Sequence, residues 1–248
     1  GDQLESTAAM IAKTQRAILP DQRGTGNSAI EPFDLSKFSR DLLIGDLETI
    51  RSDLGIESWT VLGHSWGGML AMAYAAKHPD AINQLILLAP GGIEPSFKMT
   101  SQQNLMAGLG PDEMTKLSQL QPKDPSMEAM AEVITEANRI MSKAMVASDE
   151  DVAALRKEFE DGKYNGAVGL ALQSTMGNMD LRESVDSFAK PVLIIQGDQD
   201  AIGRSTIDTI AKTLEQSKIV IIDDCGHWPM IESPEAMGKA LAEFLAAE

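Results

Sequence analysis

The feature that most constrains this chain is the stretch at residues 59–76, WTVLGHSWGGMLAMAYAA. It begins with a short apolar run that contains β-branched residues and has the length of one buried strand. A glycine-flanked turn with Ser65 at its centre follows, and residues 69–77 are then good helix formers without Gly or Pro. A strand, a sharp turn and a helix with serine at the apex are the context that the G-x-S-x-G motif requires.

The turn itself predicts chemistry at Ser65. Gly63 and Gly67 are expected because a side chain at either position would crowd the turn. Strained backbone at the apex would lift the Ser65 Oγ clear of the sheet, and the helix behind it supplies backbone N–H groups and a partial positive charge. We expect the N–H of Trp66 to stabilise an oxyanion formed beside Ser65. The alternative is a chance Gly-Ser-Gly turn, since G-x-S-x-G alone is common.

The rest of the chain alternates between helical and strand patterns, which indicates βαβ units and a mostly parallel sheet. From residue 93 to about 187 no clear strand appears, and helical stretches are broken by Gly and Pro. We therefore predict an α/β core in two parts, residues 1–92 and 188–248, with a helical cap at 93–187. Helices are expected at 1–13, 35–54, 69–77, 203–214 and 234–247, and strands at 16–19, 59–62, 85–88, 191–196 and 218–222.

Composition excludes several classes of protein. The net charge of −16, from 21 basic and 37 acidic residues, argues against nucleic-acid and anionic-membrane partners. No apolar run approaches the roughly 20 residues of a membrane helix. A single cysteine, Cys225, excludes an internal disulfide, and three histidines leave few ligands for zinc. We expect no metal or organic cofactor, no nucleic-acid or membrane partner, and a cytoplasmic location.

A nucleophilic serine needs a base, and the chain offers three histidines. His64 precedes Ser65 on the turn, where its side chain cannot easily reach the Ser65 Oγ from the required side. His78 is about 20 Å away along the predicted helix, where it is expected to cap the C-terminus. His227 follows the last predicted strand, and loops at the carboxyl ends of parallel strands carry catalytic groups. The sequence therefore predicts His227 as the base.

An acid that orients the base is expected at the end of the neighbouring strand. Asp198 and Asp200 both follow the apolar strand at residues 191–196. We favour Asp200, because Asp198 falls inside the tight turn and is expected to hold it. A purely turn-forming role is the alternative for either residue.

Five segments resemble the α/β-hydrolase fold superfamily over the whole length of the chain. They are PDQRGTGNS (20–28), VLGHSWGG (61–68), YAAKHPDAINQLIL (74–87), IIQGDQD (194–200) and CGHWPMIESPE (225–235). DQRGTG together with GHSWGG is most similar to the proline iminopeptidase-like branch of serine peptidases. The resemblance implies an α/β-hydrolase fold and a triad in the order Ser65, Asp200, His227.

The resemblance also implies strands ahead of residue 1, ending in a loop whose N–H completes the oxyanion hole. These N-terminal strands are missing from the sequence. Either the sequence is a fragment of a longer chain, or a separate N-terminal segment completes the sheet. In both cases we expect the missing strands to belong to the functional protein.

These patterns predict a serine hydrolase that cleaves a small amide or ester through an acyl-enzyme. A proline iminopeptidase-like aminopeptidase with a small-molecule or short-peptide substrate is placed first. The alternatives are a carboxylesterase or lactone hydrolase, or a ligand-binding protein of this fold with little turnover. A haloalkane dehalogenase or epoxide hydrolase would need Asp at position 65. Glu128, Glu132 and Glu136 share one predicted helix face, which could bind a substrate amine but is expected to be a solvated surface.

Overall fold

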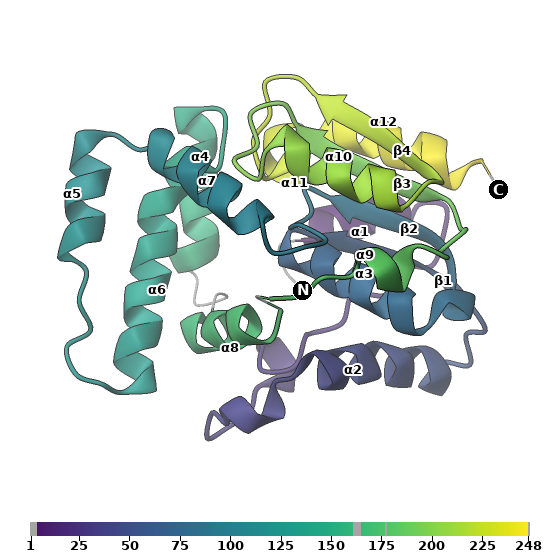
Figure 1. Ribbon diagram of the computed structural model, residues 1–248, viewed down its shortest axis with the longest axis horizontal. Helices are drawn as coiled ribbons and strands as arrows, with labels where there is room; N and C mark the ends of the chain where they lie inside the picture. Colours follow the sequence, from purple (N-terminus) through teal and green to yellow (C-terminus); the bar gives the residue numbers. More distant parts are fainter. Residues whose placement is uncertain (1–3, 161–164, 177, 248) are drawn as a thin grey trace.

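The computed structural model describes residues 4–160, 165–176 and 178–247. A parallel four-stranded sheet with helices packed on it forms one side of the molecule (Figure 1). Its spatial order is β1-β2-β3-β4, and each neighbouring pair is parallel. This confirms the prediction of a mostly parallel sheet flanked by helices. The strands are β1 (Trp59–His64), β2 (Ile82–Leu88), β3 (Val192–Gly197) and β4 (Ser217–Ile222).

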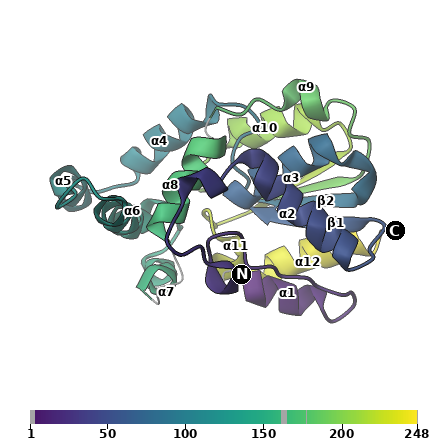
Figure 2. The same ribbon diagram turned by 90° about the horizontal axis from the view of Figure 1, so that it is seen from below.

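Helices cover both faces of the sheet, as the two views show (Figures 1 and 2). Because side chains alternate along a strand, the apolar runs at residues 85–88 of β2 and 192–195 of β3 supply apolar groups to both faces. Leu85 and Ile194 pack with α2, α3, α9 and α10 on one face, whereas Ile86 and Ile195 pack with α1 and α12 on the other. These helices are α1 (Glu5–Ile11), α2 (Arg40–Asp53), α3 (Trp66–Lys77), α9 (Arg182–Val185), α10 (Arg204–Thr213) and α12 (Pro234–Leu245).

A helical insertion separates β2 from β3 and extends to one side of the sheet (Figure 1). Its position agrees with the helical segment expected from the sequence, and the exact division at 92/93 and 187/188 stays a prediction. Besides α9, its helices are α4 (Phe97–Ala107), α5 (Pro111–Gln119), α6 (Met127–Met141), α7 (Asp149–Glu160) and α8 (Gly166–Met176), with a 3₁₀ turn, η5 (Ser142–Ala144), before α7.

Two sequence predictions for the first half of the chain are corrected. Residues 16–19 do not form a strand: a strand needs a hydrogen-bonding partner, and β1 pairs only with β2 in the described chain. The helix expected at 35–54 is divided into a 3₁₀ turn, η3 (Leu35–Lys37), and α2. The break occurs because the Ser39 side chain accepts from the Leu42 N–H and caps α2 at that point.

The predicted helix at residues 1–13 is present as α1, and residues 1–3 lie outside the described residues. β1 is an edge strand of the described sheet, and the N-terminal segment expected beside it stays a prediction. No described helix has the length and apolar character needed to cross a membrane.

Candidate active site

Ser65 lies at the sharp turn between β1 and α3. Its backbone has φ 53° and ψ −117°, a conformation that costs a non-glycine residue about 1–3 kcal/mol. Backbone hydrogen bonds maintain it: the Ser65 N–H donates to the Leu88 carbonyl, and the Ser65 carbonyl accepts from Gly68 and Gly91. The turn is therefore fixed by β2 and by the segment that follows β2.

The glycines of the turn have different roles. A Cβ on Gly63 would lie 2.2 Å from the Gly67 carbonyl oxygen, so any side chain there would collide with backbone. A Cβ on Gly67 would meet nothing within 4 Å, so the expectation that Gly67 avoids crowding is wrong. The second tight position is Gly68, whose added Cβ would lie 2.9 Å from the Pro90 Cβ.

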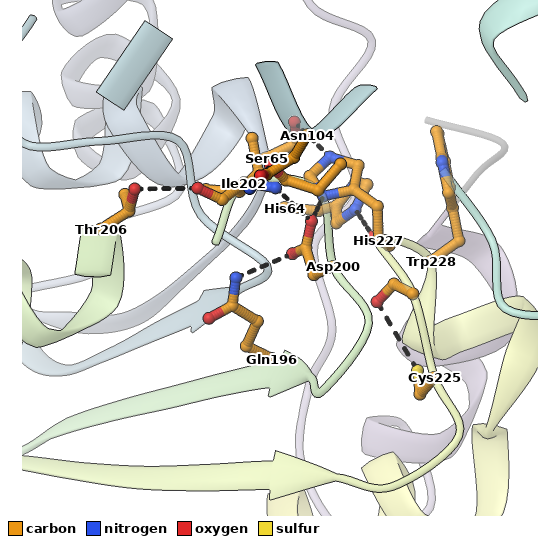
Figure 3. Close-up of polar contacts among 12 residues, drawn as sticks. His64, Ser65, Asn104, Gln196, Asp200, Ile202, Thr206, Cys225, His227 and Trp228 are labelled. Carbon is orange, nitrogen blue, oxygen red and sulfur yellow. Dashed lines mark hydrogen bonds and ion pairs between the residues drawn. The ribbon is translucent and has the colours of Figure 1, made fainter. Parts of the chain in front are cut away.

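The structure brings Ser65, His227 and Asp200 into one hydrogen-bonded chain (Figure 3). The His227 Nε2 is 2.8 Å from the Ser65 Oγ, and its Nδ1 is 3.0 Å from Asp200 Oδ1. A carboxylate only accepts hydrogen bonds, so Nδ1 of His227 carries the proton. Nε2 is then left with a lone pair aimed at the Ser65 hydroxyl.

Asp200, rather than Asp198, reaches His227. Its carboxylate also accepts from the Ile202 N–H (2.8 Å) and from the Gln196 side-chain amide (3.1 Å), which fixes its orientation. Asp198 instead accepts from the Cys225 N–H at 3.2 Å and ties the two strand-end loops together. Gln196 was not singled out from the sequence, although a lone amide at the end of the apolar run 192–195 was an available signal.

Neither of the other two histidines contacts the Ser65 hydroxyl as a base would. His78 is the C-cap residue of α3 and packs on Tyr74, with 5.2 Å between ring centroids. His64 Nε2 is 2.8 Å from the His227 carbonyl oxygen, so this nitrogen donates. The His64 ring also packs against Trp228 at 4.6 Å. His64 therefore supports the backbone of His227, a role that the sequence did not suggest.

Burial and the local charges shift the pKa values of His64, His227 and Asp200 in different directions. Burial lowers the pKa of His64 to about 3, and the nearby His227 adds to this effect, so His64 is neutral. Burial alone would lower the pKa of His227, but the Asp200 charge and hydrogen bond outweigh it and raise that pKa above the ordinary 6.5. Burial would likewise raise the pKa of Asp200, yet the His227 charge and the hydrogen bonds it accepts lower it below 3.8. Asp200 is thus a carboxylate that favours a protonated His227.

A cavity of about 830 Å³ opens beside Ser65 and His227 and extends along β1 and α2. Most of its lining is apolar, and the helical insertion contributes Leu172 and Met145. Trp66 lines it as the first residue of α3, so its backbone N–H has no acceptor within the helix. The predicted oxyanion donor therefore lies next to Ser65.

The three glutamates of α6 do not line this cavity. Glu132 forms an ion pair with Lys123, and Glu136 forms one with Arg139. Within the described parts of the chain, no cluster of three His, Cys, Asp or Glu side chains could hold a metal ion. Burial raises the pKa of the Cys225 thiol to about 12, which leaves it unreactive.

Comparisons with known proteins identify the family. The profile of the family described as alpha/beta hydrolase fold matches residues 5–234. The 2-hydroxymuconate semialdehyde hydrolase of Pseudomonas putida is 28% identical over 240 residues, which are 95% of this chain and 78% of that protein. The proline iminopeptidase of Heyndrickxia coagulans is 24% identical over 243 residues, which are 95% and 83%. An esterase structure from Exiguobacterium antarcticum superposes with a TM-score of 0.72 at 15% identity, covering 99% of this chain and 87% of that one.

The turn geometry predicts opposite outcomes for two glycine substitutions. Gly63→Ala should destabilise the protein by more than about 2 kcal/mol, because the new Cβ collides with the Gly67 carbonyl. Gly67→Ala is the matched control, and it should change stability by less than about 1 kcal/mol because the position is open and helical. Urea unfolding of both variants measures the difference. Equal losses for the two variants would contradict the assignment of Gly63 as the tight position.

Proposed function

Because this chain belongs to the α/β-hydrolase fold family, we propose that it is a serine hydrolase with Ser65 as its nucleophile. The observation that carries this proposal is the continuous chain of hydrogen bonds from Ser65 through His227 to Asp200. A nucleophile bonded to a base, which is in turn bonded to a buried carboxylate, is the arrangement that activates a serine hydroxyl.

These contacts support the following reaction. His227 Nε2 takes the hydroxyl proton as the Ser65 Oγ attacks the acyl carbon of the substrate. The resulting oxyanion accepts from the Trp66 N–H, and one such donor contributes about 10²–10³-fold to kcat. The protonated His227 then gives its proton to the leaving group. In the second half-reaction, His227 activates a water molecule that releases the acyl group from Ser65.

Asp200 supports both half-reactions without exchanging a proton. Its hydrogen bond with His227 Nδ1 selects the tautomer with a lone pair on Nε2, and its charge stabilises the imidazolium that forms. The Asp200 side chain is fully buried, so this interaction is weakly screened by solvent.

For the substrate, the cavity supports a small acyl group without a charged amine. An aminopeptidase of the kind placed first from the sequence needs an acidic group facing the substrate ammonium. Of the acids that line the cavity, Asp46 forms a bidentate pair with Arg23, and Asp21 accepts from Asn27. We therefore propose an ester or lactone ahead of an N-terminal prolyl peptide.

The relatives include both substrate classes. The Pseudomonas putida relative is named a 2-hydroxymuconate semialdehyde hydrolase, after a substrate that is not a peptide, and this name is compatible with placing the ester or lactone first. Because the H. coagulans proline iminopeptidase is also similar to this chain, an aminopeptidase is the second candidate.

Covalent labelling tests the nucleophile. A fluorophosphonate probe should form a single adduct on Ser65, and the adduct should be absent in Ser65→Ala and reduced at least about 10³-fold in rate in His227→Ala. His78→Ala is the matched control and should label at the wild-type rate, because His78 lies at the far end of α3. Peptide mass spectrometry locates the adduct. A folded protein that does not label would overturn the proposal and favour a ligand-binding protein of this fold.

A matched pair of substrates separates the two substrate classes. Proline p-nitroanilide and its N-acetylated form share a leaving group and differ in the ammonium charge. We expect kcat/KM for proline p-nitroanilide to be no higher than for its N-acetylated form. We expect p-nitrophenyl butyrate to be hydrolysed readily. A preference of more than about tenfold for the free amine would show an ammonium-binding group and favour the aminopeptidase.

The pH dependence of kcat/KM follows from His227. The base must be neutral, so the rate should fall as the pH drops through the pKa of His227, with a midpoint above 6.5. Asp200 and Glu232 face this ring as negative charges, and His64 is neutral in this range. Asp200→Asn removes the largest favourable charge, so the midpoint should move to lower pH and kcat should fall by about 10⁴-fold. A midpoint unchanged by Asp200→Asn would contradict the assigned pair.

A further inference from the structure

The His227 loop is fastened by a carboxylate outside the triad. Glu232 ends the short helix α11 (Pro229–Glu232), which begins two residues after His227. Its Oε2 accepts from the Gly226 N–H at 2.7 Å, and its Oε1 accepts from the Trp228 N–H at 2.8 Å. Gly226 and Trp228 are the residues on either side of His227. One side chain therefore holds the backbone both before and after the predicted base.

The same carboxylate reaches the helical insertion. Glu232 Oε2 also accepts from the Ala147 N–H at 2.7 Å, in the connection between η5 and α7. The His227 N–H donates to the Met145 carbonyl in that connection, at 2.7 Å. The His227 loop and residues 145–147 are thus joined by two hydrogen bonds, one of them made by Glu232.

Close packing makes this junction specific. A Cβ on Gly226 would lie 2.6 Å from the Met145 carbonyl oxygen and 2.8 Å from the Val146 Cα. Only a residue without a side chain allows the two segments to approach this closely. Burial raises the pKa of Glu232, although the three N–H groups oppose that rise by favouring the carboxylate. Burying this carboxylate costs free energy. Its three hydrogen bonds offset that cost, and they go to the His227 loop and to the adjoining segment of the insertion.

We propose that Glu232 is a positioning residue that holds the His227 imidazole in line with Ser65 by clamping the His227 loop to residues 145–147. This inference rests on the proposed function, because the hydrogen bonds of Glu232 affect catalysis only if His227 is the base. Displacing a catalytic group by about 1 Å costs about 10²-fold in rate, whereas substrate binding in a cavity lined mainly by other elements is little affected.

Graded substitution at position 232 tests the proposal. Glu232→Ala removes all three hydrogen bonds and should lower kcat about 100-fold with KM nearly unchanged. Glu232→Gln keeps acceptors for some of the three donors and should lower kcat about tenfold. Glu235→Gln is the matched control: Glu235 is an exposed carboxylate in the first turn of α12, and its loss should leave kcat within about twofold of wild type. Rates are expressed per active site, counted from the burst of p-nitrophenol, so that misfolded protein does not lower them.

Amide hydrogen exchange provides a readout that does not depend on turnover. The N–H groups of Ala147, Gly226 and Trp228 should exchange slowly in the wild type and much faster in the Glu232 variants, with the β2 and β3 amides unchanged. The proposal is overturned if kcat per site in Glu232→Ala stays within about twofold of wild type, or if Glu235→Gln loses as much. If Glu232→Ala does not fold, Glu232→Gln decides by the same two criteria.

The two proposals fail in different ways. If the wild type gives neither a burst nor a Ser65 adduct, the proposed function fails, and the exchange experiment still decides whether Glu232 clamps the loop. If the wild type gives both and the Glu232 variants retain full kcat, only the positioning role fails.

Discussion

The hydrogen bond between Ser65 and His227 is the contact on which the rest of the site depends, and it joins two opposite edges of the described sheet. β1 and β4 are separated by two strands, which is about 14 Å at the usual strand spacing. The loop after β4 must therefore cross the end of β3 before its imidazole can meet the hydroxyl. Asp198 accepts from the Cys225 N–H, and the Gln199 N–H donates to the Cys225 carbonyl. The loop after β3 therefore holds the loop after β4 in place where the two cross. The register places the ends of all four strands at one edge, which makes the crossing possible.

The helical insertion contacts both loops that carry the partners of Ser65. On one side, the Asn104 side-chain amide of α4 donates to the Ala201 carbonyl, immediately after Asp200 (Figure 3). On the other side, the Met145 carbonyl accepts from the His227 N–H. The insertion also supplies part of the cavity lining beside Ser65. The cavity lining and the orientation of the proposed triad thus depend on the same elements, so a change in the packing of the insertion would affect both.

Much of this arrangement was predictable because local patterns encode it. The strand, turn and helix around Ser65 need only short-range signals, and parallel strands place the loops with Asp200 and His227 at the same edge. The strand expected at 16–19 was wrong because its apolar pattern says nothing of whether a partner strand lies beside it. Gly67 was misjudged because crowding depends on which backbone approaches, and here the close pair is Gly63 with the Gly67 carbonyl. Glu232 escaped notice because its partner Ala147 is 85 positions away, a pairing that no periodicity reveals.

Two imidazoles lie 5.0 Å apart in this site, and their surroundings give them opposite properties. Desolvation lowers the pKa of the partly buried His64, so this ring stays neutral and serves as a hydrogen-bond donor to the His227 carbonyl. His227 contacts Asp200, so its protonated form is favoured despite the burial. If His64 were charged as well, the like charge would oppose proton uptake by His227, which the proposed mechanism requires. A neutral His64 beside Ser65 therefore supports the backbone of His227 without opposing proton uptake by the proposed base.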